Sequence, residues 1–258
     1  MSSITKDRDW GKQKKTSVFV TKPVITIAIP TYKRPKYLRE AVLSLINQNF
    51  EKNFEILIID NDESEEYIDE NIRTANLGSN IRYIVNSKNL GMFGNWNQTI
   101  LYCETDYISI LNDDDLLSPD FLRYVFPLIG TYDLIFTSCV GFKVTSELNF
   151  CDCKSVSFKK LNKSDFFWRN PSNGSLGVVF NKKKLTTKDL FQENEFPVSD
   201  YKFFYNYFLS HGAIRTSCVL AGYRWEINES LKTTVLEEFL VRSYFFRKEM
   251  IGKEVKSQ

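Results

Sequence analysis

The chain has 258 residues, of which 43% are hydrophobic, enough apolar material for one large domain with its own core. The formal net charge of +2 gives the molecule no overall attraction for nucleic acid, so a nucleic-acid partner is not expected. No apolar run reaches the roughly 18 residues of a membrane-spanning helix, and the polar start lacks the apolar segment of a secretory signal, which predicts a cytoplasmic protein.

The cysteines do not form a recognisable site. There are five of them, without a CxxC pair, and the single histidine, His211, is distant from them in sequence. They are Cys103, Cys139, Cys151, Cys153 and Cys218. This pattern argues against a zinc site or a disulfide framework and predicts reduced structural thiols in a reducing compartment.

Strand-like and helix-like segments alternate along the first half of the chain. The apolar runs that predict buried strands are residues 24–29, 54–59, 81–85 and 107–111. Between the first two, residues 36–48 carry apolar side chains at helical spacing, and an acidic helical segment and a second helical segment precede the later runs. This alternation predicts an α/β domain with a parallel sheet.

The second half is less regular. Residues 134–137 and 177–180 are strand candidates, and residues 236–251 place apolar side chains on one side of a helix. No repeat or low-complexity linker marks a second domain. The predicted organisation is a polar N-terminal extension at 1–22, one domain at 23–235 and an amphipathic C-terminal helix or tail at 236–258.

Three polar clusters follow predicted strands: residues 30–34 (PTYKR), 60–62 (DND) and 112–115 (NDDD). Ligands of parallel sheets bind outside the carboxyl ends of the strands, so the three clusters are expected at one rim. Adjacent carboxylates repel one another unless a cation is present, and oxygen ligands suit Mg²⁺ or Mn²⁺. The alternative is that the acidic run caps a helix, because Ser and Pro follow it closely. From these residues alone both interpretations stand.

Four motifs, in this order, resemble the family 2 glycosyltransferases of the nucleotide-binding GT-A fold. They are ITIAIPTYKRPKYL, EILIIDND, NLGMFGNWN and LNDDDLLSPDFL. The resemblance covers residues 24–128 strongly and 165–235 more weakly. It implies a Rossmann-like domain whose mostly parallel central sheet is flanked by helices, with a nucleotide-binding half (23–128), an acceptor-binding half (129–235) and a C-terminal helical extension.

The resemblance also implies roles for individual residues. The nucleotide-sugar contacts that it implies are Pro30, Thr31, Tyr32, Arg34, Asp60, Asn97, Asp113 and Arg224. Asp60 would accept a hydrogen bond from the imide N–H of uracil, which favours a uridine donor, and Asp113 would contact the ribose. Asp114, assisted by Asp115, would bind Mn²⁺ or Mg²⁺, which offsets the charge of the diphosphate leaving group. Asn112 stands where the commonest version of this motif has Asp.

Inverting sugar transfer requires a carboxylate that takes the proton of the acceptor hydroxyl. The resemblance implies that this base is Asp200, with Ser199 in place of the usual Glu; the residues alone favour a helix N-terminal carboxylate with Ser199 as its cap. The candidates for the acceptor pocket are Trp168, Asn173, Gly174 and Ser175. His211, which precedes a glycine, is interpreted as a helix end.

The predicted function is a metal-dependent inverting transfer of a hexose from a UDP-sugar, with UDP-glucose or UDP-galactose favoured. The acceptor implied by the resemblance is a hydroxyl of a lipid-diphosphate-linked oligosaccharide for O-antigen or capsule, at the cytosolic face of the inner membrane. The basic, aromatic tail from Arg242 fits either a peripheral contact with anionic lipid or packing on its own domain. A noncatalytic sugar-nucleotide-binding subunit is the alternative, and Asn112 and Ser199 keep it open.

Overall fold

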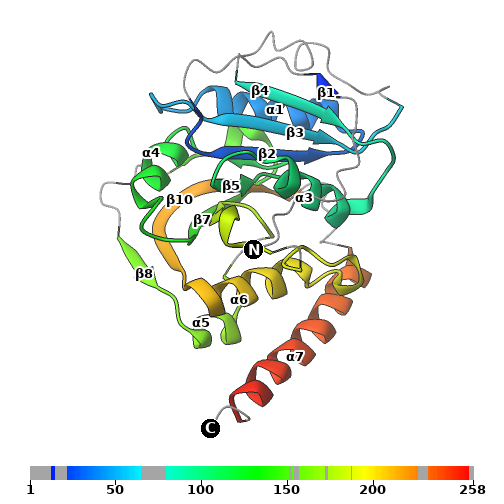
Figure 1. Ribbon diagram of the computed structural model, residues 1–258, viewed down its shortest axis with the longest axis vertical. Coiled ribbons are helices and arrows are strands. Elements are labelled where there is room, and N and C mark those ends of the chain that lie inside the picture. Colours follow the sequence, from blue (N-terminus) through cyan, green and yellow to red (C-terminus); the bar gives the residue numbers. More distant parts are fainter. Residues whose placement is uncertain are drawn as a thin grey trace.

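The computed structural model describes residues 13–14, 22–64, 80–150, 153, 157–171, 174–186, 188–225 and 232–255. In this part of the chain, ten strands form one sheet in the order β1-β4-β3-β2-β5-β9-β7-β10-β6, with β8 paired to β10 (Figure 1). The strands are β1 (Gln13–Lys14), β2 (Thr26–Thr31), β3 (Glu55–Asp60), β4 (Ile81–Val85), β5 (Tyr107–Ile110), β6 (Leu116–Leu117), β7 (Leu134–Phe142), β8 (Phe158–Lys160), β9 (Val178–Asn181) and β10 (Ile214–Arg224). The α-helices are α1 (Pro35–Ile46), α3 (Gly91–Tyr102), α4 (Phe121–Val125), α5 (Lys163–Trp168), α6 (Ser199–His211) and α7 (Thr233–Val255).

The first half of the sheet has the predicted parallel arrangement. β4, β3, β2 and β5 are parallel neighbours, and the register pairs Thr31 with Asp60, so β2 and β3 end at the same edge. The helix α1 shares a core cluster with Ile27, and α3 shares another with Ala28. Because successive strand residues point to opposite faces, the two helices cover opposite faces of the sheet.

The second half adds antiparallel strands to a mostly parallel sheet. β9 is antiparallel to both β5 and β7, whereas β7 and β10 are parallel to each other. The two predicted strands correspond to β7 and β9, and β10 is an eleven-residue strand that the sequence pattern did not indicate. Of the other predicted segments, the acidic helical segment after Asp60 and nearly all of the N-terminal extension lie outside the described residues.

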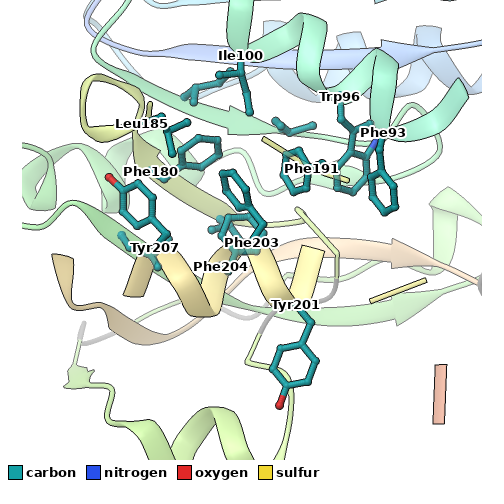
Figure 2. Packing of buried hydrophobic residues seen from close by; sticks show 14 of the residues in the cluster. Phe93, Trp96, Ile100, Phe180, Leu185, Phe191, Tyr201, Phe203, Phe204 and Tyr207 are labelled. Carbon is teal, nitrogen blue, oxygen red and sulfur yellow. The ribbon is translucent and has the colours of Figure 1, made fainter. Parts of the chain in front are cut away.

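A cluster of aromatic rings joins the two halves (Figure 2). Phe93 and Trp96 of α3 meet Phe191, which stacks on Phe203 of α6 with 4.2 Å between ring centroids. Phe204, one residue further along α6, packs edge-on against Phe180 of β9. Large rings packed in this way restrict movement of α6 relative to the first half of the sheet, and the start of α6 is therefore held in place.

The C-terminal helix α7 has two apolar sides. One side packs on α6, where Phe246 meets the rings of Tyr201 and Tyr205. The exposed large apolar residues on α7 are Leu236, Leu240, Val241, Tyr244, Phe245 and Ile251. The helix thus packs on its own domain and still presents an apolar surface to solvent; Figure 1 shows it extending away from the sheet. None of the described helices is both long and apolar enough to cross a membrane.

One expectation about the cysteines is wrong. Cys153 and Cys218 form a disulfide bond, with their Cα atoms 5.7 Å apart. They are 65 positions apart in sequence, and the pairing depends on how β10 is placed, so their spacing along the chain gave no signal. Cys103 is buried and Cys139 is half-buried, and neither is part of this bond; Cys151 lies outside the described residues.

Candidate active site

A cavity of about 810 Å³ opens where the ends of β2 and β5 meet the start of α6. The first turn of α3, the end of β10 and the first turns of α7 complete its walls. The residues from the sequence analysis that it brings together are Pro30, Thr31, Tyr32, Arg34, Asp113, Asp114, Gly174 and Asp200. Segments that are far apart in sequence therefore contribute carboxylates to one cavity.

The loop after β2 is bonded to the acidic run after β5. Thr31 donates its hydroxyl to Asp113 Oδ2 at 2.8 Å. Arg34 Nη1 lies 3.4 Å from Asp113 Oδ1 and 3.0 Å from Asp114 Oδ2. Between them, Lys33 has a φ of 56°, a left-handed conformation that few non-glycine residues adopt, and it allows the loop to turn. The loop thus brings a cation to the two carboxylates.

The carboxylates of this wall have raised pKa values. Burial raises the pKa of Asp113 to about 6; the charge of Asp114 adds to this shift, and Arg34, the Thr31 hydroxyl and the Tyr32 backbone N–H oppose it. Burial also raises the pKa of Asp114, although Arg34 again opposes the shift. A further cation at this wall would favour the ionised forms.

Asp115 faces away from the cavity. Its Oδ1 accepts the backbone N–H of Arg224 at 3.0 Å, and its Oδ2 accepts the side-chain amide of Asn112 at 3.0 Å. Burial and the charge of Asp114 raise its pKa to about 8. The geometry assigns Asp115 to holding the acidic loop against β10, whereas Asn112 lines the cavity.

Arg224 is bonded to the acidic loop that carries Asp114. Its Nε donates to the backbone carbonyl of Asp114 at 2.8 Å, and its Nη2 donates to Glu40 Oε2 at 2.6 Å. The guanidinium also lies 4.6 Å from the ring centroid of Phe142. Only 4% of Arg224 is exposed, and it does not line the cavity, so the structure does not place it where it would meet a diphosphate.

Asp200 also lines the cavity, at the second residue of α6. Burial raises its pKa to about 6, against the lowering effect of its own backbone N–H, that of Tyr201 and the side chain of Asn170. Ser199 is not the helix cap, because Val198 holds that position; the Ser199 hydroxyl instead accepts the backbone N–H of Gln192 at 2.7 Å. A buried carboxylate with a raised pKa in the lining of a cavity has the properties of a general base.

Comparison with known proteins identifies the family. The model for Glycosyl transferase family 2 matches residues 26–187. The chain belongs to glycosyltransferase family 2. It is 27% identical over 229 residues to an uncharacterized glycosyltransferase of Methanocaldococcus jannaschii, which covers 86% of this chain and 70% of that protein.

Two shorter matches are to proteins named as sugar transferases. The abequosyltransferase RfbV of Salmonella typhimurium is 39% identical over 103 residues, and this match covers 38% of this chain and 30% of RfbV. WcaA of Escherichia coli, named for colanic acid biosynthesis, is 32% identical over 103 residues, with 38% and 35% of the two chains covered. Both matches therefore span about a third of the relative's length.

The fold is that of a solved family member. The structure of S. aureus TarS has a TM-score of 0.63 and 18% identity, covering 86% of this chain and 72% of that chain. Two other TarS structures are complexes with UDP and with UDP-GlcNAc. At this identity the likeness shows the fold alone, and it confirms the predicted α/β sheet with flanking helices.

Besides Arg224, two nucleotide-sugar residues expected from the family 2 motifs lie outside the cavity lining. The Asp60 carboxylate accepts the hydroxyl of Tyr83 and the backbone N–H of Asp62. Asn97 of α3 exchanges two hydrogen bonds with the backbone of Phe191, at 2.8 and 2.9 Å. The asparagine of α3 that does line the cavity is Asn95, which donates to the backbone carbonyls at the ends of β2 and β3. Residues two apart on a helix face different directions, so a family 2 motif that both could satisfy gave no signal for which one lines the cavity.

The expected acceptor residues are divided in the same way. Gly174 lines the cavity, Trp168 is 78% exposed and outside it, Ser175 is buried outside the lining, and Asn173 lies outside the described residues. The lining residues that the family 2 motifs did not indicate include Asn170, Trp225, Val235, Leu236 and Phe239. As predicted, His211 ends α6 before Gly212.

The acidic wall suits a hard divalent cation. The described residues contain no group of three or more His, Cys, Asp or Glu side chains that would hold a metal without other ligands. Asp113, Asp114 and the amide oxygen of Asn112 offer an oxygen-only set at the cavity. Mg²⁺ and Mn²⁺ commonly take one or two carboxylates from a protein and complete their shell with substrate phosphate, so this donor set fits such an ion.

Proposed function

We propose that the protein is a metal-dependent, inverting sugar transferase that uses a UDP-sugar and glycosylates a hydroxyl of a growing surface glycan. The observation that carries this proposal is that one cavity joins two separated carboxylate groups, the Asp113–Asp114 pair and Asp200. Two carboxylate groups, carried by different segments of the chain, match the two tasks of the reaction. One task is to bind the diphosphate, and the other is to remove a proton from the acceptor.

The donor end of the cavity is the acidic wall. Asp114 would be the principal ligand of Mn²⁺ or Mg²⁺, with Asp113 and the Asn112 amide oxygen beside it; when bound, the ion would offset the charge of the departing diphosphate. Thr31 and the Tyr32 backbone fix Asp113, and Arg34 adds a positive charge at the same wall. We favour UDP-glucose or UDP-galactose, and because TarS binds UDP-GlcNAc, that donor belongs in the same screen.

The acceptor end is apolar and aromatic around Asp200. With a pKa of about 6, Asp200 is mostly ionised at neutral pH and can take the proton of an acceptor hydroxyl. Trp225, which is 54% exposed and lines the cavity, offers a flat surface on which a sugar ring would stack. The match of this chain to WcaA, which is named for colanic acid biosynthesis, supports an acceptor from a bacterial surface polysaccharide. We propose that this acceptor is carried on a lipid diphosphate.

The position of α7 supports an acceptor at a membrane. Leu236 belongs both to the cavity wall and to the exposed side of the helix, where Leu240, Tyr244 and Ile251 continue outward. An apolar helix face that starts at a substrate cavity is suited to lie on lipid. We therefore place the protein at the cytosolic face of the inner membrane, with α7 against the bilayer.

The decisive experiment is a donor screen. UDP release is measured with a panel of UDP-sugars, Mn²⁺ and synthetic lipid-diphosphate acceptors, and the product linkage is determined by NMR. Turnover that requires both Asp114 and Asp200 is the expected result. Donor binding without turnover by the intact protein would overturn it and support the alternative of a noncatalytic sugar-nucleotide-binding subunit, for which Asn112 and Ser199 are the motif departures.

A further inference from the structure

Asn170 lies beside Asp200 although the two come from different segments. Asn170 follows α5, and Asp200 is in the first turn of α6; both line the cavity. The side chain of Asn170 is hydrogen-bonded to the Asp200 carboxylate. Because an ionised carboxylate has no proton to give, the Asn170 amide N–H is the donor.

The hydrogen bonds of Asp200 leave it restrained but not saturated. A carboxylate has about four acceptor positions on its two oxygens. Three donors contribute here: the backbone N–H groups of Asp200 and Tyr201, and the Asn170 side chain. The two backbone donors belong to the same helix turn as Asp200, so Asn170 is the donor that approaches from another segment. These three donors are fewer than the roughly four acceptor positions of a carboxylate.

The charged side chains near Asp200 do not account for the stabilisation of its ionised form. The other charged side chains that line the cavity are Arg34, Asp113 and Asp114, and none of them contributes to the pKa shift of Asp200. Next to Asp200 on α6, Lys202 forms an ion pair with Glu195 at 2.6 Å. From α7, Arg247 lies over the ring of Tyr201. Among the described side chains, only Asn170 contributes to stabilising the ionised form of Asp200.

We propose that Asn170 is a positioning residue, whose amide N–H holds the Asp200 carboxylate ionised and turned toward the acceptor hydroxyl. This inference rests on the proposed function of Asp200 as the base.

The test is the pH dependence of kcat/KM in two variants. For Asn170→Ala, loss of the hydrogen bond raises the pKa of Asp200 by about one unit, which moves the acid limb up by the same amount. The ionised fraction then falls about fivefold at pH 6 and about twofold at pH 7, and a loss in kcat from poor orientation remains at higher pH. Asn170→Asp places a second carboxylate there and moves the limb further in the same direction.

The matched control is Asn206→Ala, the same substitution at an exposed position on α6 outside this cavity. It leaves the acid limb in place. An unmoved limb in Asn170→Ala, or a limb that moves equally in Asn206→Ala, would overturn the positioning role. A direct readout separates this result from a failure of the proposed function: NMR of ¹³C-labelled aspartate carboxyls reports the pKa of Asp200 whether or not the protein turns over. An unchanged Asp200 pKa in Asn170→Ala would also refute the inference.

Discussion

The two carboxylate walls of the cavity reach similar pKa values for different reasons. On the acidic wall, burial and a neighbouring carboxylate raise the pKa of Asp113 to about 6, while Arg34 opposes the shift. For Asp200, burial alone raises the pKa to about 6, and the groups that oppose it are neutral. The acidic wall has two carboxylates for one arginine and suits a further cation, whereas Asp200 suits a proton. The same side-chain type can therefore serve two tasks because its surroundings differ.

The strongest test of this division is Asp200→Asn, which keeps the shape of the side chain and removes the base. We expect kcat to fall by about 10³-fold, within the range of general-base catalysis, with little change in donor affinity. UDP release in the presence of acceptor and equilibrium donor binding measure the two effects. The matched control is Asp165→Asn, at the N-terminal turn of α5. Equal losses in both variants would mean that Asp200 acts only as a helix N-terminal carboxylate.

Asp114→Asn tests the acidic wall. Loss of the Asp114 carboxylate should lower kcat/KM by about 10²-fold by weakening electrostatic stabilisation of the diphosphate. Unlike Asp200→Asn, it should also weaken Mn²⁺ binding, measured by titration calorimetry in the presence of UDP. Asp120→Asn, six positions along the chain and outside the cavity, is the control. Unaltered Mn²⁺ affinity in Asp114→Asn would contradict the division between the walls.

Arg224→Ala tests whether the acidic wall depends on the hydrogen bonds that Arg224 makes to it. Removing a buried guanidinium that bonds Glu40 and the Asp114 carbonyl should lower the free energy of unfolding by about 3 kcal/mol. Because the loop that carries Asp114 loses its support, Mn²⁺ affinity should fall by about tenfold. Denaturant unfolding and metal titration give the two values. Arg123→Ala, an exposed arginine on α4, should change stability by less than about 0.5 kcal/mol. If Arg224→Ala retains full metal affinity, the supporting role is refuted.

Asp200→Asn should also stabilise the protein above pH 6. The pKa of Asp200 in the folded state, about 6, is above the ordinary value of 3.8, so the native state binds this proton more tightly than the unfolded state. The contribution of Asp200 to stability therefore declines as pH rises from about 4 to about 6 and stays lost above it. The variant should gain about 3 kcal/mol at pH 8 and about 0.5 kcal/mol at pH 4. Urea unfolding at the two pH values measures this, and a gain of equal size at both would rule out the ionisation of Asp200 as its cause.

The smallest effect is the response of the acid limb of kcat/KM to metal concentration. Ionisation of Asp200 places a limb near pH 6. Protons also compete with metal for Asp113 and Asp114, and this competition makes a second contribution to the limb. Raising the Mn²⁺ concentration should move the contribution of Asp113 and Asp114 to lower pH. The contribution of Asp200 should stay in place. A complete pH profile at two Mn²⁺ concentrations tests this, and a limb that moves as a whole would assign it to the acidic wall alone.

The rim of the parallel strands could be predicted because its causes are local. Runs of apolar residues ending at Ile29, Ile59 and Leu111 predict strands, and parallel neighbours bring their ends to one edge. The part of the cavity that contains Asp200 was harder to predict. Asp200 was identified through a motif, whereas Asn170 and the first residues of α7 carry no motif and reach the cavity only through packing.

The sequence by itself determined the alternation of strands and helices, the family and the three polar clusters, since each depends on residues close together in the chain. Only the tertiary structure decided which polar side chains line the cavity. Asp115 meets the backbone of Arg224 across 109 positions, and Asn95 rather than Asn97 faces the cavity. Both outcomes depend on how elements distant in sequence pack, because burial and hydrogen-bond partners are properties of the assembled core and not of local pattern.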